Sequence, residues 1–282
     1  MANEIKQFNN KANRLFEFLA TLRKYGGIFI ALFRASAISE LEFRFNILAR
    51  IFTDILWYGA QLSVFEVVFR HTSQLNGWTL QTIRVFMGVL FVTDSIFMLF
   101  FQTNLDQLGT KIRRGSLDLL LAKPVNSQWF LSVQRVSVPY LGNFFLSSAW
   151  LIWALVQVPD FQIHRALWLV IMVPCSVLIC YSLRFIVATS ALFFTQADAI
   201  TQIWWQLYRL GTRPDSTYPL VLRYTVLTFL PVAFLASVPA RFLLGWADPM
   251  LALLGCTVAG LLLWASTWLW KRGLRQYSSA SS

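Results

Sequence analysis

The sequence predicts an all-α integral membrane protein with six transmembrane helices, an N-terminal amphipathic interfacial helix and both termini in the cytoplasm. Of its 282 residues, 57% are hydrophobic and only 13% are charged, whereas about 25% of the residues in a soluble globular protein are charged. Apolar stretches of about 20 residues, the length of a bilayer-spanning helix, fill most of the sequence after residue 46. This composition excludes a disordered chain, a disulfide-stabilised secreted domain and an ordinary cytosolic enzyme.

Residues 1–46 are too polar to cross a membrane, and we expect them to form cytoplasmic or interfacial amphipathic helices. Their apolar residues recur at alternating steps of three and four, which places them on one face of a helix: Ile5, Phe8, Ala12, Leu15, Leu19 and Leu22. After a break at Gly26-Gly27, residues 28–45 mix aromatic and charged side chains, which is typical of a helix in the membrane interface. A coiled-coil helix that binds a partner is the alternative for the first face.

Six segments have the length and the apolar character of bilayer-crossing helices: 47–69, 83–104, 134–158, 167–194, 219–243 and 250–270. The fifth is interrupted by two arginines and two prolines, Arg223, Pro231, Pro239 and Arg241. We therefore expect it to end near Val238 and to continue as a broken, re-entrant or interfacial piece. Residues 47–271 then form one transmembrane domain, and residues 272–282 form a cytoplasmic tail.

The basic residues predict the orientation, because cytoplasmic loops of membrane proteins are enriched in Lys and Arg. An N-terminus inside the cell puts seventeen of them on the cytoplasmic side, namely Lys6, Lys11, Arg14, Arg23, Lys24, Arg34, Arg44, Lys111, Arg113, Arg114, Lys123, Arg135, Arg209, Arg213, Lys271, Arg272 and Arg275. The opposite side receives only Arg70, Arg84, Arg165 and Arg241. The net charge of +11 is thus explained by orientation in a membrane, and no nucleic-acid partner is expected.

Four charged residues fall inside the predicted spans: Arg50, Asp54, Asp94 and Arg184. Charges in a membrane are costly and mark functional positions by default. Arg50 and Asp54 are four residues apart, so they can pair on one helix face, and Glu66 and Arg70 repeat that spacing. Asp94 and Arg184 have no partner on their own helices, so we expect them to contact other spans or a polar cavity.

The sequence shows no catalytic constellation. It has no phosphate-binding Gly-x-x-x-x-Gly-Lys-Ser/Thr loop, and its two histidines, His71 and His164, are too few for a histidine-based metal site or triad. Cys175, Cys180 and Cys256 lie inside apolar runs and are interpreted as small packing residues. We expect a protein that is not an enzyme and binds neither a metal nor a cofactor itself.

The segment 111–125 between the second and third spans contains the signals of a short helix. Ser116 suits the N-cap, Asp118 the first turn and Lys123 the last, and Pro124 stops the helix. Three leucines fall on one face, Leu117, Leu120 and Leu121. A helix of about two turns is not stable alone, so it must lie on the membrane surface or on a cytoplasmic partner.

This segment resembles the Gly-x-Leu-Asp-x-x-Leu-x-Lys-Pro signature of the type-2 ATP-binding-cassette (ABC) permeases, the membrane subunits of ABC exporters, from Gly115 to Pro124. Similarity continues through most of the chain, at residues 24–25, 42–46, 77–78, 218–220, 229–234, 238–240, 243–245 and 273–279. The family pattern usually has a glycine after the final serine pair, where this chain has Ala280.

The resemblance implies a six-span permease in a bacterial cytoplasmic (inner) membrane, paired with a second permease, identical or related, and resting on two separate ABC ATP-binding subunits. ATP and Mg²⁺ would bind those subunits. Residues 231–248 would form a re-entrant extracellular portion. The ATPase-coupling helix would comprise Arg113, Arg114, Gly115, Ser116, Leu117, Asp118, Leu120, Leu121, Lys123 and Pro124, with the three leucines in an apolar groove of the ATPase.

Three functions are compatible with these features. The first is the permease of an ATP-driven exporter, surrounded by membrane lipids, with an unidentified substrate. The second is an ion- or proton-coupled secondary transporter that uses Asp54, Asp94 and Arg184 as a relay. The third is a noncatalytic membrane assembly factor.

Overall fold

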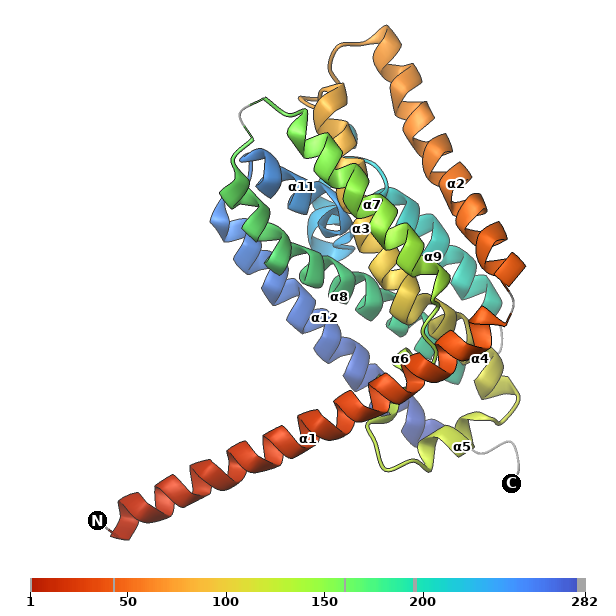
Figure 1. Ribbon diagram of the computed structural model, residues 1–282, viewed down its shortest axis with the longest axis vertical. Coiled ribbons are helices and arrows are strands. Elements are labelled where there is room, and N and C mark those ends of the chain that lie inside the picture. Colours follow the sequence, from red (N-terminus) through yellow and green to blue (C-terminus); the bar gives the residue numbers. More distant parts are fainter. Residues whose placement is uncertain (1, 43, 160, 195–196, 278–282) are drawn as a thin grey trace.

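The computed structural model describes residues 2–42, 44–159, 161–194 and 197–277, and these residues are helical almost throughout, with no β-strand among them. Figure 1 shows a bundle of long helices with one helix, α1, projecting from it. The helices in chain order are α1 (Ala2–Leu41), α2 (Arg44–His71), α3 (Leu80–Phe97), η1 (Met98–Gln102), α4 (Thr103–Arg113), α5 (Leu117–Leu121), α6 (Ser127–Val133), α7 (Pro139–Val156), η2 (Ile163–Leu167), α8 (Trp168–Thr189), η3 (Ser190–Leu192), α9 (Ala197–Gly211), η4 (Asp215–Thr217), α10 (Leu220–Tyr224), η5 (Thr225–Phe229), η6 (Val232–Leu235), α11 (Ser237–Leu244) and α12 (Pro249–Gln276).

Within the part of the chain that the structure describes, five helical stretches are long and apolar enough to cross a membrane. They are Ile47–His71, Leu80–Arg113, Pro139–Val156, Ile163–Leu192 and Pro249–Gln276. These stretches confirm the first four predicted spans and the sixth, and the chain is a multi-pass membrane protein.

Loops from distant parts of the sequence meet at one end of the bundle, which we call the Trp78 end. The Trp78 indole Nε1 donates to Ser216 Oγ at 3.0 Å, and the Asn76 side-chain amide donates to the Ser216 carbonyl at 2.9 Å. The Trp246 ring lies 5.1 Å from the Trp78 ring. Arg165 donates to the Leu244 carbonyl at 3.1 Å. The opposite end carries α4, α5 and α6, and we call it the α5 end (Figure 1).

The predicted fifth span, 219–243, does not cross the bundle. Asp215, just before α10, accepts hydrogen bonds from Ser237 and Arg241 of α11. The segment therefore leaves the Trp78 end and returns to it. The helical backbone stops at Leu230 and Pro231, where a proline has no amide hydrogen to continue it. The expected re-entrant portion is thus larger than predicted, because it begins at α10.

The helix α9 leads from the α5 end toward the Trp78 end and stops short of it (Figure 1). Tyr208, three residues before the end of α9, already meets Asp94 of α3. The helix begins next to η3, which packs against α4, and it ends at Gly211, whose Cα faces the Val232 carbonyl of the re-entrant segment. Polar side chains such as Gln202, Gln206 and Arg209 are exposed on one face of α9. This polar face lowers the hydropathy of residues 197–211 below that of an ordinary span, so the sequence did not predict a helix here.

The position of α9 changes the side on which Arg209 and Arg213 lie. Both were predicted on the same side as the segment 111–125. They lie at the end of α9 and just after it, on the Trp78 side of the Tyr208–Asp94 hydrogen bond. Arg223 also lies at the Trp78 end, where it pairs with Asp215. With these three residues counted there, the comparison is fifteen against seven. The asymmetry still favours a cytoplasmic α5 end.

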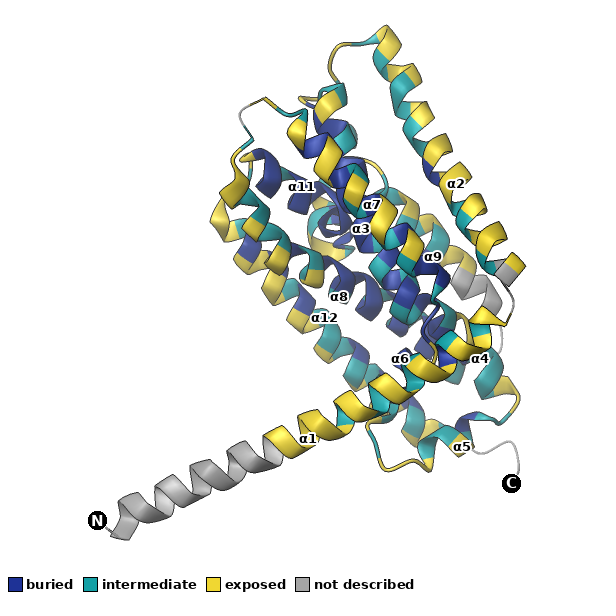
Figure 2. Cartoon of the chain, in the orientation of Figure 1, coloured by how far each residue is buried: buried dark blue, intermediate teal, exposed yellow. Residues whose placement is uncertain are grey.

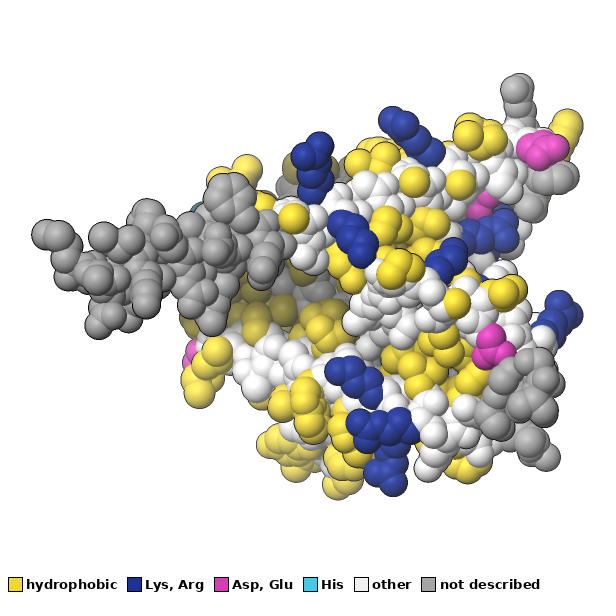
Figure 3. All heavy atoms as spheres, turned by 90° about the horizontal axis from the view of Figure 1, so that it is seen from below, with side chains coloured by type: hydrophobic (Ala, Val, Ile, Leu, Met, Phe, Trp, Pro, Cys, Tyr) yellow, Lys and Arg dark blue, Asp and Glu magenta, His cyan; other side chains and the backbone are white. Residues whose placement is uncertain are grey.

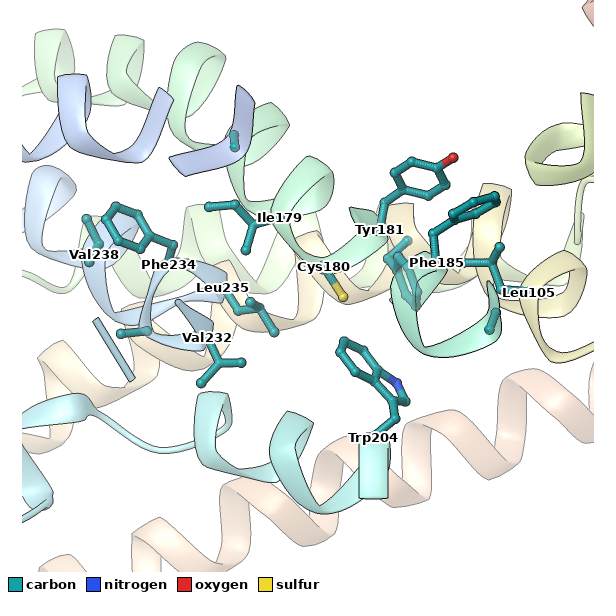
Figure 4. Packing of buried hydrophobic residues seen from close by; sticks show 14 of the residues in the cluster. Leu105, Ile179, Cys180, Tyr181, Phe185, Trp204, Val232, Phe234, Leu235 and Val238 are labelled. Atoms are coloured by element: carbon teal, nitrogen blue, oxygen red, sulfur yellow. The ribbon is translucent and has the colours of Figure 1, made fainter. Parts of the chain in front are cut away.

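The hydrophobic core surrounds α3, which is buried along most of its length between α7 and α8 (Figure 2). A second packing centre joins α8, α9, α12 and the re-entrant segment. In Figure 4 the Trp204 indole of α9 points toward Cys180 of α8, and Phe234 and Leu235 of η6 fill the space beside Ile179. In a membrane protein such helices are held by van der Waals packing and not by exclusion of water, and this close packing fixes α9 against α8.

The helix α2 is set apart from this core and exposes most of its surface (Figure 2). Its exposed apolar residues include Leu48, Phe52, Leu56 and Trp57. Such a surface is compatible with lipid or with another membrane protein.

The N-terminal region is one continuous helix, α1, so the predicted break at Gly26-Gly27 is wrong. A glycine inside a helix costs only about 1 kcal/mol, which is not enough to end a helix held by contacts on either side. Leu19 and Leu22 of the predicted apolar face are exposed. The side chains of Ile5, Phe8, Ala12 and Leu15 lie outside the described residues.

Candidate functional site: a charged cavity and the α5 segment

A cavity of about 790 Å³ lies between α2, α3 and α9, within the size range of ligand-binding sites. The residues that line it are Thr53, Asp54, Trp57, Tyr58, Gln61, Val64, Phe65, Leu90, Phe91, Asp94, Met98, Trp205, Gln206, Tyr208, Arg209, Leu210, Thr212, Arg213 and Tyr218. The helix α9 was not predicted, and therefore the cavity that its polar face shares with Asp94 was not predicted either.

Two predicted intramembrane charges, Asp54 and Asp94, line this cavity. Asp54 accepts a hydrogen bond from the Asn143 amide of α7 at 2.6 Å, and Asp94 accepts one from the Tyr208 hydroxyl of α9 at 2.5 Å. Asp94 thus contacts the helix α9 and lines a cavity with polar residues in its wall, in agreement with the expectation that its partners lie off its own helix. Asp94 lies about 21 Å along α3 from its first residue, and the helical stretch continues beyond it through η1 and α4 to Arg113.

The prediction that Arg50 and Asp54 pair with each other is wrong, because each bonds a side chain of α7. Arg50 donates to the Tyr140 hydroxyl at 2.8 Å, and its guanidinium lies 4.8 Å from the centre of the Tyr140 ring. Both residues of α2 thus point to side chains of α7, Tyr140 and Asn143. Partners on a neighbouring helix outweigh a pair on one helix surface, which contributes only about 0.2–0.5 kcal/mol.

The predicted Glu66–Arg70 pair is replaced in the same way. Glu66 accepts two hydrogen bonds from Arg84 of α3, at 3.0 and 2.5 Å, and Arg84 also donates to Gln157 at 3.2 Å. These contacts connect α2, α3 and α7 near the Trp78 end.

Arg184 contacts another span, as predicted, but outside the cavity. Its guanidinium donates to Asp106 of α4 at 2.6 Å, and Gln102 donates to the same carboxylate at 2.9 and 2.7 Å. Arg184 is buried, and two of its nitrogens have no hydrogen-bond partner among the described residues. Since Arg184 does not line the cavity, a relay through Asp54, Asp94 and Arg184 has no support from this geometry.

Aromatic side chains form much of the cavity wall. The rings of Tyr58 and Phe91 are stacked with their centres 4.0 Å apart. Trp57 and Trp205 line the cavity from α2 and α9. The cavity carries both signs of charge. Asp54 and Asp94 lie on α2 and α3, and Arg209 and Arg213 follow Tyr208, at the end of α9 and just after it.

The segment that resembles the permease signature forms a turn and the short helix α5 at the α5 end. The helix α4 ends at Arg113, and Gly115 has a φ of 70°, which favours glycine. The helix α5 starts at Leu117 with Asp118 in its first turn, as predicted. Ser116 stands at the N-cap position, but its hydroxyl donates to the Lys111 carbonyl at 3.3 Å and does not cap the helix.

The apolar face of α5 packs against the chain's own core, so the prediction that Leu117 fills a groove on a partner is wrong. Leu117 is fully buried, and Leu120 and Leu121 pack against the same core cluster as Leu108 and Trp270. The short helix needed a surface to lie on, and this chain supplies it. The leucine that faces outward is Leu119, which is 75% exposed and was not predicted as a site residue.

The helix α1 holds the loop after α5. Lys24 donates to the Pro124 carbonyl at 2.9 Å, and the Asn126 amide donates to the Tyr25 hydroxyl at 3.1 Å. The Tyr25 ring meets the Trp129 ring edge to face at 4.7 Å. The motif residue Lys123 lies over the ring of Phe130 at 4.3 Å.

The end of the molecule that carries these elements is rich in basic side chains. Figure 3 shows Lys and Arg spread over this face, with hydrophobic side chains between them and few acidic ones. Arg113, Arg114 and Lys123 are exposed there. An acidic partner surface with an apolar slot for Leu119 would be complementary to this face.

Two thiols approach each other on α8 and α12, with the sulfur atoms of Cys175 and Cys256 3.4 Å apart. This proximity was not predicted from the sequence. Among the described residues, no group of three or more His, Cys, Asp or Glu side chains could hold a metal ion.

Comparison with known proteins gives one match. A family model described as "ABC-2 family transporter protein" matches residues 55–281. No curated protein and no solved structure matches the chain significantly.

Proposed function

Because the chain belongs to the ABC-2 transporter family and is thus a multi-pass ABC permease, we propose that it is the membrane subunit of an ATP-driven exporter. ATP and Mg²⁺ bind separate ABC ATP-binding subunits, and this chain supplies the pathway. It lies in a bacterial cytoplasmic membrane with the α5 end inside. This orientation rests on the remaining asymmetry of fifteen basic residues against seven.

The observation that carries the proposal is the way α5 is presented. Hydrolysis on another chain can move the spans only through a physical contact. The helix α5 is joined to α4 through Gly115, rests on the core through Leu117 and is followed by a loop that α1 holds at Pro124. A force on α5 therefore reaches α3 and α4 on one side and α1 on the other. Leu119 is the apolar contact for the ATPase, and the surrounding basic side chains meet acidic groups at its rim.

A second permease, identical or related, completes the membrane unit in this proposal. The exposed apolar face of α2 is its best contact surface, because α2 packs less closely on its own bundle than α3, α7 or α8. The cavity beside α2 then lies next to that contact.

Purification from native membranes in mild detergent tests the proposal. We expect stoichiometric ATP-binding subunits to accompany the wild-type chain. Leu119→Asp should remove them or abolish transport-linked hydrolysis, because truncation or disruption of an interface hot spot costs at least about 2 kcal/mol. The permease itself should still fold, since Leu119 does not pack in the core.

Ile163→Asp is the matched control, since Ile163 is 85% exposed at the Trp78 end. It introduces the same charge at the opposite end and should leave the ATPase content unchanged. Normal ATPase content and normal coupled hydrolysis in Leu119→Asp would show that α5 is not the contact.

A further inference from the structure

We propose that the cavity between α2, α3 and α9 binds an amphipathic organic cation, a molecule with a positively charged group on an apolar or aromatic body. The inference rests on the proposed function, because it names the class of substrate. It is carried by three features of the cavity, namely the two carboxylates without a cationic partner, the aromatic walls and the position of the arginines.

The two carboxylates that line the cavity, Asp54 and Asp94, have no cationic partner among the described residues. Each accepts one hydrogen bond from a neutral group, the Asn143 amide or the Tyr208 hydroxyl. Neutral donors orient a carboxylate but do not cancel its charge, and an uncompensated charge within a membrane protein is costly. A ligand cation supplies the missing charge.

The walls beside these carboxylates suit a cation with an apolar body. Tyr58, from the stacked Tyr58–Phe91 pair, and the indoles of Trp57 and Trp205 line the same cavity. Aromatic faces attract cations through the ring's electron-rich face, and more strongly when water is excluded. The same rings offer apolar area to the rest of the ligand.

The arginines of the cavity define where the cation lies. Arg209 and Arg213 line the cavity on the Trp78 side of Tyr208, the partner of Asp94, and repel a cation there. The ligand's positive group is therefore favoured beside Asp54 and Asp94, and its other end points to the Trp78 end. That polarity distinguishes the cavity from a wholly apolar lipid site.

A pair of ions with the same shape and opposite charge tests the proposal. The purified full-length chain in lipid nanodiscs is incubated with radiolabelled tetraphenylphosphonium, a cation, or tetraphenylborate, its anionic counterpart. We expect saturable binding of the cation and no comparable binding of the anion. Asp94→Asn and Asp54→Asn should each weaken binding of the cation by about tenfold or more, which corresponds to about 1.4 kcal/mol.

Three further variants separate charge from folding. Asp94→Glu keeps the charge and should retain most of the binding. Trp57→Ala changes a side chain that is 60% exposed, so it should weaken binding several-fold without a folding defect. Glu42→Gln removes one negative charge at an exposed position outside the cavity and should bind tetraphenylphosphonium like the wild type.

Equal binding of both ions, absence of saturable binding, or wild-type affinity in both Asp→Asn variants would overturn the proposal. If Asp94→Asn does not fold, the Asp54→Asn and Trp57→Ala variants decide. The assay uses the permease without an ATPase. Its failure therefore leaves the ATPase contact untouched, and a missing ATPase leaves the binding result interpretable.

Discussion

Asp215 ties the re-entrant segment to the end of α9. Its carboxylate is fully buried and accepts hydrogen bonds from Arg223 at 3.0 Å, Arg241 at 2.5 Å and Ser237 at 2.6 Å. Its backbone amide donates back to the Ser237 hydroxyl at 3.1 Å. A carboxylate held in this way fixes three segments of the chain at one point of the Trp78 end.

Asp215→Asn should lower the stability of the folded chain by about 3 kcal/mol, because it leaves Arg241 with an uncompensated charge. We take the lower end of the usual range, since both arginines retain some contact with solvent. Thermal unfolding in detergent measures the effect. Asp248→Asn is the control, because Asp248 is exposed and caps α12, and Asn caps as well as Asp. Equal midpoints in the two variants would contradict this role of Asp215.

At the scale of elements, the junction between α4 and α5 depends on the backbone of Gly115. Its φ of 70° costs a residue with a Cβ about 1–2 kcal/mol, whereas Asn tolerates this region better. Gly115→Val should therefore displace α5 and reduce hydrolysis coupled to transport, and Gly115→Asn should retain most of it. The measurement is the ATPase activity of purified complexes that contain either the wild-type permease or one of the two variants. Full coupling in Gly115→Val would show that the turn is not needed.

The helix α9 shows what a hydropathy pattern leaves out. Neither this helix nor its place beside α8 was predicted, because Gln202, Gln206 and Arg209 give it a polar face. That face is accommodated by a cavity formed with α2 and α3, a tertiary feature that hydropathy does not contain. The run 219–243 has the opposite property, since its apolar character comes from burial in a re-entrant fold.

For the whole molecule, the sequence predicted the class, five of the crossings and a short helix with Asp118 in its first turn. These follow from composition, length and backbone conformation, which are local properties. The partners of Arg50, Asp54 and Glu66 could not be predicted, because they lie on α7 and α3. Leu119 was missed for a related reason. Which side of a short helix faces outward depends on where the core of the chain lies.

The central proposal for the molecule is that α9 carries the chain from the α5 end toward the Trp78 end, so that Arg213 is reached from outside while α5 faces the cytoplasm. Single cysteines at Ser73, Arg213 and Ser116 in a cysteine-free background, treated in intact cells with an impermeant thiol reagent, test it most directly. Ser73→Cys and Arg213→Cys should react from outside, and Ser116→Cys should react only after the membrane is opened. Protection of Arg213→Cys together with labelling of Ser73→Cys, or labelling of Ser116→Cys from outside, would contradict this arrangement.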